Sequence, residues 1–322
     1  MYISATNFIP EMMYNRRKFL QNAGSLVIGQ ALLSNKLLAN SLNPAGQPIG
    51  LQLYTLSSII DDDLDGALKK VAAIGYKEIE SAYSKKGGFY GMKAPQFAAH
   101  LKSMGLSWKS HHVIGAPIAE LMKGRQLKDA NGKPMVFPAL LNLKENMQQV
   151  VDEAAAGGLP YLVCASIPVD TAADLKVSVK TLNKTAEACH KAGITFAYHN
   201  HDKEFEKVDG LIPYDILLKE TDPNKLKMEL DLCWVTKAGV DPVMLFKQNP
   251  GRFPLLHVKD IDQGKEKPLP VGTGVVDFKH VFANAKIGGV KHYFVEHDMP
   301  ADPFASITTS YQNLKKLLAA TV

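Results

Sequence analysis

The feature that most constrains the fold is a regular alternation of two sequence patterns from Ile49 onward. Short runs rich in β-branched and aromatic residues are each followed by a longer run with helical periodicity. The strand-like runs cover residues 49–56, 76–83, 106–113, 161–168, 194–201, 227–235, 253–261 and 291–298. The helical runs cover residues 64–74, 94–104, 142–156, 172–192, 213–220, 242–248, 278–285 and 304–320. Eight such units predict a single (β/α)8 TIM barrel over residues 48–322.

Two details of the pattern support this assignment. Glycines 75, 105, 157 and 193 directly follow predicted helices, where glycine is a common stop signal. The main alternative is an open doubly wound sheet, but no glycine-rich phosphate turn follows the first strand. Residues 114–141 form the longest insertion, and its place after the third strand predicts a lid or substrate loop at the barrel mouth.

The first forty residues have the pattern of an export signal. The motif NRRKFL at residues 15–20 precedes an apolar stretch at residues 23–33, and small residues follow near residue 39. A basic region, a short apolar core and small residues are typical of a signal peptide, and paired arginines resemble the twin-arginine type. We therefore expect residues 1–40 to direct export to the periplasm, without a stable membrane anchor. An ordinary N-terminal amphipathic helix is the alternative.

Charge and cysteine content exclude several classes of protein. The formal charge is +5, but residues 1–39 contribute +3 of it through four basic residues and Glu11. The near-neutral remainder does not favour nucleic acid as a partner. Cys164, Cys189 and Cys233 form no CxxC pair, so we expect buried small side chains instead of disulfides or a cysteine zinc site.

Polar residues gather late in the predicted strands. In a barrel of this kind the catalytic end is formed by the carboxyl ends of the strands, and alternate residues point inward. His199 and His201 share one face of the fifth strand, and Glu229 and Asp231 share one face of the sixth. Other inward polar residues are Glu80 on the second strand, Ser110 and His112 on the third, His257 and Lys259 on the seventh, and Glu296 on the eighth.

This concentration of ionisable groups predicts a metal site. Burying so many ionisable side chains is costly without a partner, and one divalent cation satisfies several at once. We expect His199, Asp231, His257 and Glu296, one from each of the last four strands, to bind one divalent metal ion. Two imidazoles and two carboxylates suit Mn²⁺, Co²⁺, Zn²⁺ or Mg²⁺.

At these motifs the chain resembles the xylose isomerase-like, sugar phosphate isomerase/epimerase superfamily, from about Ile49 to the C-terminus. The matching pieces are YHNH at 198–201, ELDLCW at 229–234, HVKD at 257–260, VGTG at 271–274 and VEHD at 295–298. The resemblance implies a metal held by Glu, Asp, His and Glu, as in ketose 3-epimerases. Asp231, His257 and Glu296 match that set, whereas His199 stands where those enzymes have glutamate.

The substitution at His199 leaves the reaction open. In the epimerases the two glutamates also form the acid/base pair, so a symmetric two-carboxylate epimerisation is in question here. The resemblance still implies a divalent-metal-dependent isomerase or epimerase that acts on a keto-sugar through an enediolate. Exported relatives resemble 3-keto-glycoside lyases or hydratases, and inosose dehydratases share the His-x-His strand, so elimination or hydration is an alternative.

Site roles beyond the metal follow from the same placement. Candidate catalytic groups are Glu296, His201, Lys259 and His112. Glu80 could hold a substrate hydroxyl, and Tyr54 and Trp234 could pack on sugar faces. A non-catalytic, metal-dependent sugar-binding barrel is an alternative of another class, and a DNA-repair nuclease is disfavoured by the near-neutral charge. The partner expected is a small carbohydrate; a homo-oligomer is possible.

Overall fold

The structure is a computed structural model that describes residues 46–123 and 140–320. The export signal predicted for residues 1–40 and residues 124–139 of the predicted insertion lie outside the described residues. No helix among the described residues is long and apolar enough to cross a membrane.

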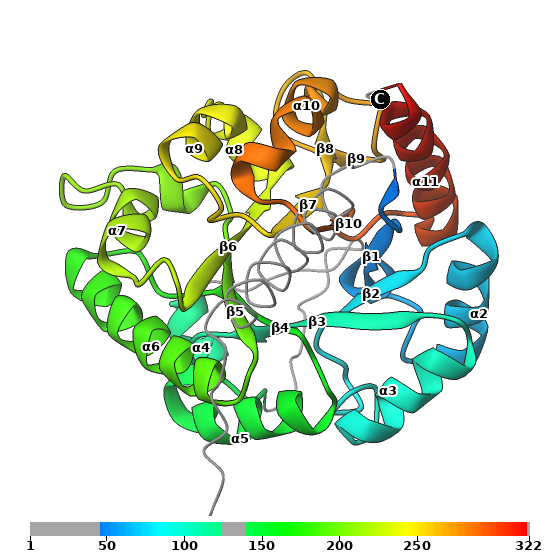
Figure 1. Ribbon diagram of the computed structural model, residues 1–322, viewed down its shortest axis with the longest axis horizontal. Coiled ribbons are helices and arrows are strands. Elements are labelled where there is room, and N and C mark those ends of the chain that lie inside the picture. Colours follow the sequence, from blue (N-terminus) through cyan, green and yellow to red (C-terminus); the bar gives the residue numbers. More distant parts are fainter. Residues whose placement is uncertain (1–45, 124–139, 321–322) are drawn as a thin grey trace, which may run out of the picture. The chain divides into compact units, whose positions relative to one another are not determined.

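Eight parallel strands close into a barrel, which confirms the predicted TIM barrel and rules out the open sheet (Figure 1). Each strand pairs with the next along the chain, and the last pairs with the first. The barrel strands are β1 (Gly50–Gln52), β2 (Glu78–Ser81), β3 (Ser107–Ile114), β4 (Tyr161–Ser166), β5 (Thr195–His199), β6 (Leu226–Asp231), β7 (Leu255–Val258) and β10 (His292–Val295).

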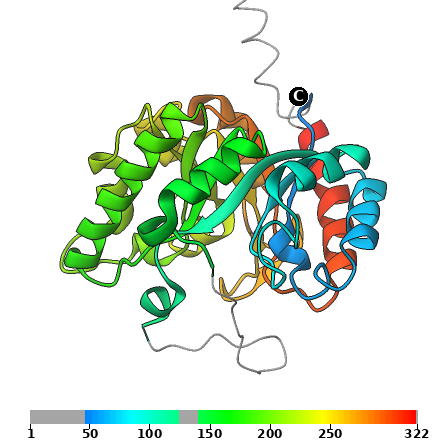
Figure 2. The same cartoon turned by 90° about the horizontal axis from the view of Figure 1, so that it is seen from below.

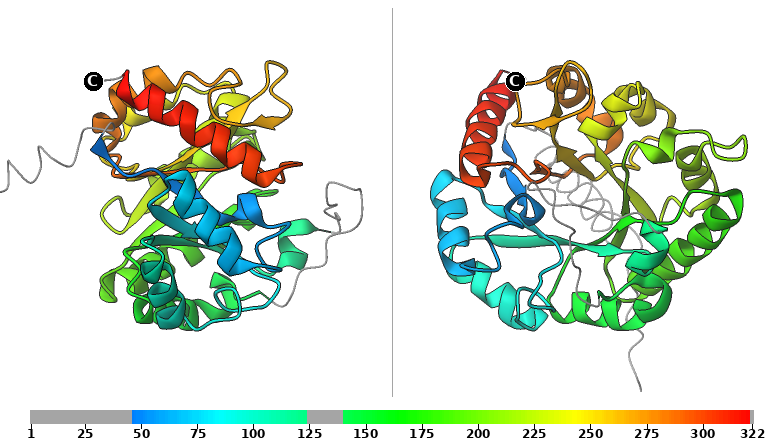
Figure 3. Two further views of the ribbon diagram at one scale, coloured as in Figure 1. Left: turned by 90° about the vertical axis from the view of Figure 1, so that its right-hand side faces the viewer. Right: turned by 180° about the vertical axis from the view of Figure 1, so that it is seen from behind.

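Helices surround the strands, as the end-on views in Figures 1 and 3 show. The helices of the outer ring are α2 (Leu64–Ile74), α3 (Ala94–Ser103), α5 (Leu143–Ala156), α6 (Ala172–Lys191), α7 (Pro213–Glu220), α8 (Leu232–Lys237), α9 (Pro242–Gln248), α10 (Phe278–Gly288) and α11 (Pro303–Ala319). The short helix α4 (Ile118–Met122) follows β3 and stands apart from this ring (Figure 2). Two 3-10 turns, η2 (Leu53–Leu56) and η3 (Lys203–Phe205), complete the described elements.

Local sequence explains where the helices begin and end. Asp63, Thr171 and Asp302 each accept a hydrogen bond from a backbone N–H three residues further on, which caps α2, α6 and α11. Gly75 and Gly193 follow α2 and α6 with φ of 125° and 75°, a region that favours glycine. Helix boundaries predicted from these signals therefore lie within a few residues of the observed ones.

Most predicted strands were longer than the observed ones, and for three of them the local reason is clear. β1 ends at Gln52, whose side chain accepts from the Tyr54 N–H and starts η2. β6 ends at Asp231, because its carboxylate caps α8. The seventh run divides into β7 and the two-residue β8 (Asp260–Ile261), which pairs antiparallel with β9 (Pro268–Leu269).

The interior of the barrel has an apolar layer and a polar layer. Tyr161, Val163, Ala197, Leu255 and Phe294 form a buried cluster of their own, separate from the core between strands and helices. Nearer the carboxyl ends of the strands, the interior side chains are polar. Those that are buried are Gln52, Glu80, Ser110, His199, Glu229, Asp231 and His257. The apolar layer closes the barrel on one side and leaves the ionisable groups at the catalytic end.

The VGTG motif has a structural role. The buried carboxylate of Asp260 accepts hydrogen bonds from the backbone N–H groups of Ile261, Gly272, Gly274 and Val276. A Cβ at Gly274 would lie 2.1 Å from the Ile261 carbonyl oxygen, so the loop can approach Asp260 only with glycine there. This motif therefore fixes the loop after β9 and does not face the cavity described below.

Candidate metal centre and active-site cavity

The four predicted metal ligands converge at the carboxyl ends of the last four strands. Asp231 on β6 is in register with His257 on β7, and Glu296 directly follows β10. The Asp231 Oδ2 atom lies 4.0 Å from His199 Nε2 and 3.8 Å from His257 Nδ1. His257 Nδ1 lies 3.0 Å from Glu296 Oε2. One donor atom from each residue falls within 4.8 Å of the others, and all four side chains are buried.

The two oxygens of Asp231 show that a cation fits this arrangement. Oδ1 accepts from the Trp234 N–H at 2.9 Å and so belongs to the cap of α8. Oδ2 is buried and makes no hydrogen bond among the described residues, and the Lys259 ammonium lies 3.1 Å from it. A buried carboxylate oxygen without a hydrogen bond is costly unless a cation satisfies it. Mixed imidazole and carboxylate donors around this oxygen suit Zn²⁺ or Mn²⁺ as well as the related ions.

Beneath the two ligand histidines lies a second pair of carboxylates. The Glu229 Oε2 atom is 3.2 Å from His199 Nδ1 and 3.2 Å from His257 Nε2. The Glu80 Oε1 atom is 2.6 Å from His257 Nε2 and also accepts from Gln52 Nε2 at 2.8 Å. Each histidine therefore turns one ring nitrogen toward Asp231 and the other toward a buried carboxylate. Such carboxylates commonly orient metal-bound histidines and fix the tautomer.

These contacts distinguish two overlapping clusters of potential ligands. The first comprises His199, Asp231, His257 and Glu296, and the second comprises His112, His199, Glu229 and His257. In the second cluster the carboxylate is already engaged, since Glu229 Oε2 lies 2.7 Å from His112 Nε2. Each cluster contains a buried carboxylate oxygen without a hydrogen bond, Asp231 Oδ2 in the first and Glu229 Oε1 in the second. The first cluster differs in having a carboxylate, that of Glu296, which lines the cavity. We therefore take the first as the candidate metal centre and the second as its support.

Lys259 places a buried cation beside the candidate ligands. Its side chain is 1% exposed, and Nζ lies 3.1 Å from Asp231 Oδ2, 2.6 Å from Glu296 Oε2 and 2.9 Å from Asp298 Oδ2. Burial lowers the pKa of Lys259, but these three carboxylates outweigh burial and hold the pKa well above its usual value. The ammonium group therefore compensates carboxylates that a metal would also neutralise.

Burial and nearby charges also shift the pKa values of Glu296, His112 and His199. Burial raises the pKa of the Glu296 carboxyl, but Lys259 and His257 outweigh burial and lower it. Burial lowers the pKa of His112, but Glu80 and Glu229 outweigh burial and raise that pKa to about 9. Burial, together with the neighbouring histidines, holds the pKa of His199 well below its usual value. His199 is thus neutral, the form in which histidine binds metals.

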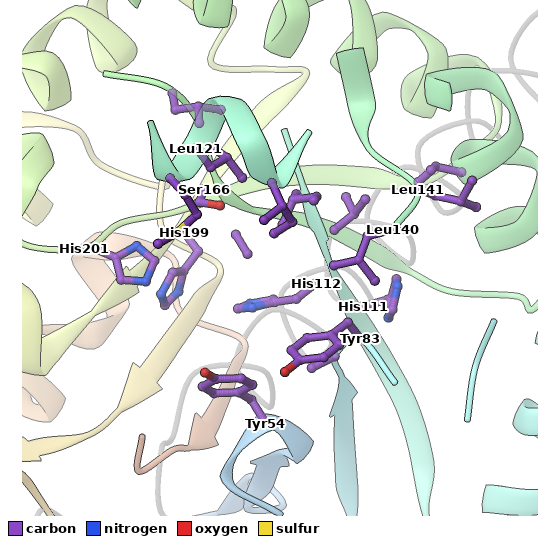
Figure 4. A pocket seen from close by; sticks show the side chains of 18 of the residues that line it. Tyr54, Tyr83, His111, His112, Leu121, Leu140, Leu141, Ser166, His199 and His201 are labelled. Carbon is purple, nitrogen blue, oxygen red and sulfur yellow. The ribbon is translucent and has the colours of Figure 1, made fainter. Parts of the chain in front are cut away.

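A cavity of about 1090 Å³ opens beside this centre (Figure 4). Six predicted site residues line it: Tyr54, His112, His199, His201, Trp234 and Glu296. Asp231, His257 and Lys259 lie behind this wall, fully or almost fully buried. In Figure 4 the rings of His199 and His201 lie together, with centroids 5.0 Å apart. His201 lies beyond the end of β5, where its backbone N–H donates to Glu204.

Glu80 occupies a different place from the one expected of a hydroxyl-binding group. Its side chain is fully buried below the cavity, and its carboxylate contacts Gln52, Ser110, His112 and His257. This position makes Glu80 a partner of the histidines. Glu229 was not among the predicted site residues, although its spacing from Asp231 placed it on the same face of the strand. Asp298, Tyr83 and His111 also line the cavity and were not predicted.

The role of Glu229 gives a direct prediction. Glu229→Gln is expected to weaken metal binding by about 10- to 100-fold, because an amide orients His199 and His257 less well than a carboxylate. Isothermal titration with Mn²⁺ and Zn²⁺ measures this change. The matched control is Glu78→Gln, since Glu78 is also buried in the barrel but contacts His292 and Lys109 instead. Equal affinity for metal in Glu229→Gln and the unaltered protein would remove Glu229 from the centre.

Fold and site together define a (β/α)8 barrel with a buried His/carboxylate centre beside a large cavity. Residues 68–318 match the xylose isomerase-like TIM barrel family, and the chain belongs to that family.

Individual relatives agree with this assignment. An inosose dehydratase of Geobacillus thermodenitrificans is 25% identical over 170 residues, which cover 46% of this chain and 56% of that enzyme. The match thus spans little more than half the length of that curated relative. A sugar phosphate isomerase/epimerase from Parabacteroides distasonis is 27% identical, with a TM-score of 0.67 over 84% of this chain and 94% of the other. The IOLI protein, solved with a bound zinc atom, is 15% identical; its TM-score is 0.64, covering 86% and 99% of the two chains.

Proposed function

We propose that the protein is a divalent-metal-dependent isomerase or epimerase that acts on a keto-sugar through an enediolate. The observation that carries this proposal is the convergence of His199, Asp231, His257 and Glu296 at the wall of one large cavity. The named activity of the Parabacteroides relative supports a sugar substrate, and the zinc of the IOLI protein supports a metal.

The bound cation would act as a Lewis acid that polarises the carbonyl group and its neighbouring hydroxyl. Glu296 is the candidate ligand carboxylate that reaches the cavity, and its lowered pKa keeps it ionised. In that form it is the group placed to accept a proton from the carbon between those oxygens. Lys259 donates to Glu296 at 2.6 Å and fixes the orientation of that carboxylate. Glu296, the proposed base, is thus held at the edge of the cavity by Lys259, which does not line the cavity.

Other side chains of the wall are placed to hold a sugar. The Trp234 indole N–H is buried without a hydrogen-bond partner among the described residues, so it can donate to a substrate oxygen. The Tyr54 ring offers a face for packing beside Tyr83, with ring centroids 6.1 Å apart. His112 and His201 also contribute imidazole rings to the wall of the cavity.

Elimination is a second candidate, favoured by two observations. His199 replaces one of the two carboxylates that a symmetric epimerisation uses, so Glu296 is the sole candidate ligand carboxylate that lines the cavity. His112 also lines the cavity and, with its pKa raised to about 9, can give a proton to a departing oxygen. The similarity to an inosose dehydratase points the same way. Proton removal by Glu296 is the first step in both reactions.

Hydrogen exchange tests the shared step. The metal-loaded protein should catalyse exchange of the C–H next to the carbonyl of a keto-sugar in D₂O, followed by NMR across free ketoses, inososes and 3-keto-glycosides. New sugar signals would identify isomerisation or epimerisation, and an α,β-unsaturated ketone would identify elimination. Chelator-treated protein is the control and should give no exchange. Sugar binding without exchange across the whole panel would contradict an enzyme and favour a non-catalytic binding barrel.

A further inference from the structure

The cavity is larger than a single sugar ring requires. Pockets of roughly 300–1,000 Å³ accommodate drug-sized ligands, and this cavity has a volume of about 1090 Å³. A monosaccharide bound at Glu296 and His199 would therefore leave much of the space unfilled. If the ligand fills the whole cavity, a second part of that ligand must occupy the space that the sugar ring leaves.

The two ends of the cavity differ in chemistry. The end formed after β5, β6 and β10 carries His199, His201, Trp234, Glu296 and Asp298. The other end follows β3 and β4 and includes α4. Its lining is mostly apolar, although Glu153, Ser166 and Asp170 also line this end. The apolar side chains, called here the apolar wall, are Ile118, Leu121, Leu140, Ile167 and Val169, joined by Phe89 from the loop after β2. In Figure 4, Leu140 lies on the opposite side of His112 from His201.

Both ends belong to one continuous space. His112 lines the cavity between them, and its ring nitrogen is directed to Glu229 and Glu80 on the polar side. Apolar side chains gathered in a concave site, together with a few converging polar groups, are typical of sites that bind an amphipathic ligand. A free sugar would leave the apolar wall against water, whereas a ligand with an apolar portion would cover it.

We propose that the substrate is a keto-sugar bonded to an apolar group, such as an aryl or alkyl aglycone. The sugar occupies the polar end beside Glu296, and the apolar group packs on Leu121, Leu140 and Ile167. The inference rests on the proposed function for the identity of the sugar part, but the preference for an apolar group is a separate property of the cavity.

Calorimetric binding tests the preference without requiring turnover. The probes are matched methyl and phenyl glycosides of glucose, galactose and xylose, titrated into the metal-loaded protein. For at least one sugar, the phenyl glycoside should bind about tenfold tighter or better than its methyl partner, since one well-placed apolar group commonly gives that factor. Equal affinity within every pair, or no binding by any probe, would overturn the inference.

Matched variants locate the effect. Leu121→Asn on α4 should reduce the phenyl preference to about threefold or less and leave metal binding unchanged. Val177→Asn is the control, because Val177 is 53% exposed on α6 and does not line the cavity; it should keep the preference. If Leu121→Asn keeps the full preference, the apolar wall is not the binding surface. A phenyl preference without hydrogen exchange would retain this inference and contradict the proposed reaction, so the two fail separately.

Discussion

Asp231→Ala is expected to abolish tight binding of a divalent metal, with a loss of affinity greater than the 10- to 100-fold typical of residues that only support a ligand. The reason is that Asp231 Oδ2 lies between His199 Nε2 and His257 Nδ1 and has only the ion pair with Lys259, not a hydrogen bond, to compensate it. Isothermal titration with Mn²⁺ and Zn²⁺ measures the loss, and circular dichroism checks that the barrel remains folded.

Asp231→Asn separates the two roles of this residue. Asparagine can keep the Oδ1 acceptor that caps α8 at the Trp234 N–H, but it removes the carboxylate charge. We expect both variants to lose metal binding, and Asp231→Ala to lose about 1 kcal/mol more of its free energy of unfolding. Full metal occupancy in both variants would show that Asp231 is not a ligand.

Lys259→Met is expected to lower the free energy of unfolding of the metal-free protein by about 3–5 kcal/mol, the usual consequence of removing one partner of a buried ion pair. Nζ contacts Asp231, Glu296 and Asp298, and the side chain is 1% exposed, so methionine removes the ammonium that these three carboxylates share. Chemical denaturation after chelation measures the change.

Metal should restore much of that stability, because a divalent ion would neutralise Asp231 and Glu296 in place of the ammonium. Denaturation of Lys259→Met with and without saturating Mn²⁺ tests this. The control is Lys259→Arg, which keeps the positive charge and should lose less stability in the metal-free state. If the metal-free Lys259→Met variant is as stable as the metal-free unaltered protein, the three carboxylates do not need the Lys259 ammonium to balance their charge.

The barrel could be predicted from sequence because each unit carries its own signals. Helices α2, α7 and α9 begin and end where periodicity, capping residues, proline and glycine place them. The strand ends were harder. Asp231 is the last residue of β6, and only the hydrogen bond from the Trp234 N–H shows that a helix starts there. Strand periodicity cannot distinguish an inward carboxylate from a helix cap.

The convergence of the four candidate ligands was predictable, whereas the contacts around them were not. His199, Asp231, His257 and Glu296 fall at the same height on four consecutive strands, a pattern visible in the sequence. The contacts of Glu229 with both histidines, and of Glu80 with His257 from the other side of the barrel, depend on how the strands close. Sequence alternation shows which residues point inward but not which nitrogen of a histidine each inward carboxylate meets.

Diffraction at the absorption edge of a bound metal tests the central claim most directly. Crystals grown with Mn²⁺ or Zn²⁺ should show one strong anomalous peak, bounded by His199 Nε2, Asp231 Oδ2, His257 Nδ1 and the Glu296 carboxylate. A peak among His112, Glu229 and the opposite nitrogens of the two histidines, or no peak at saturating metal, would contradict the account.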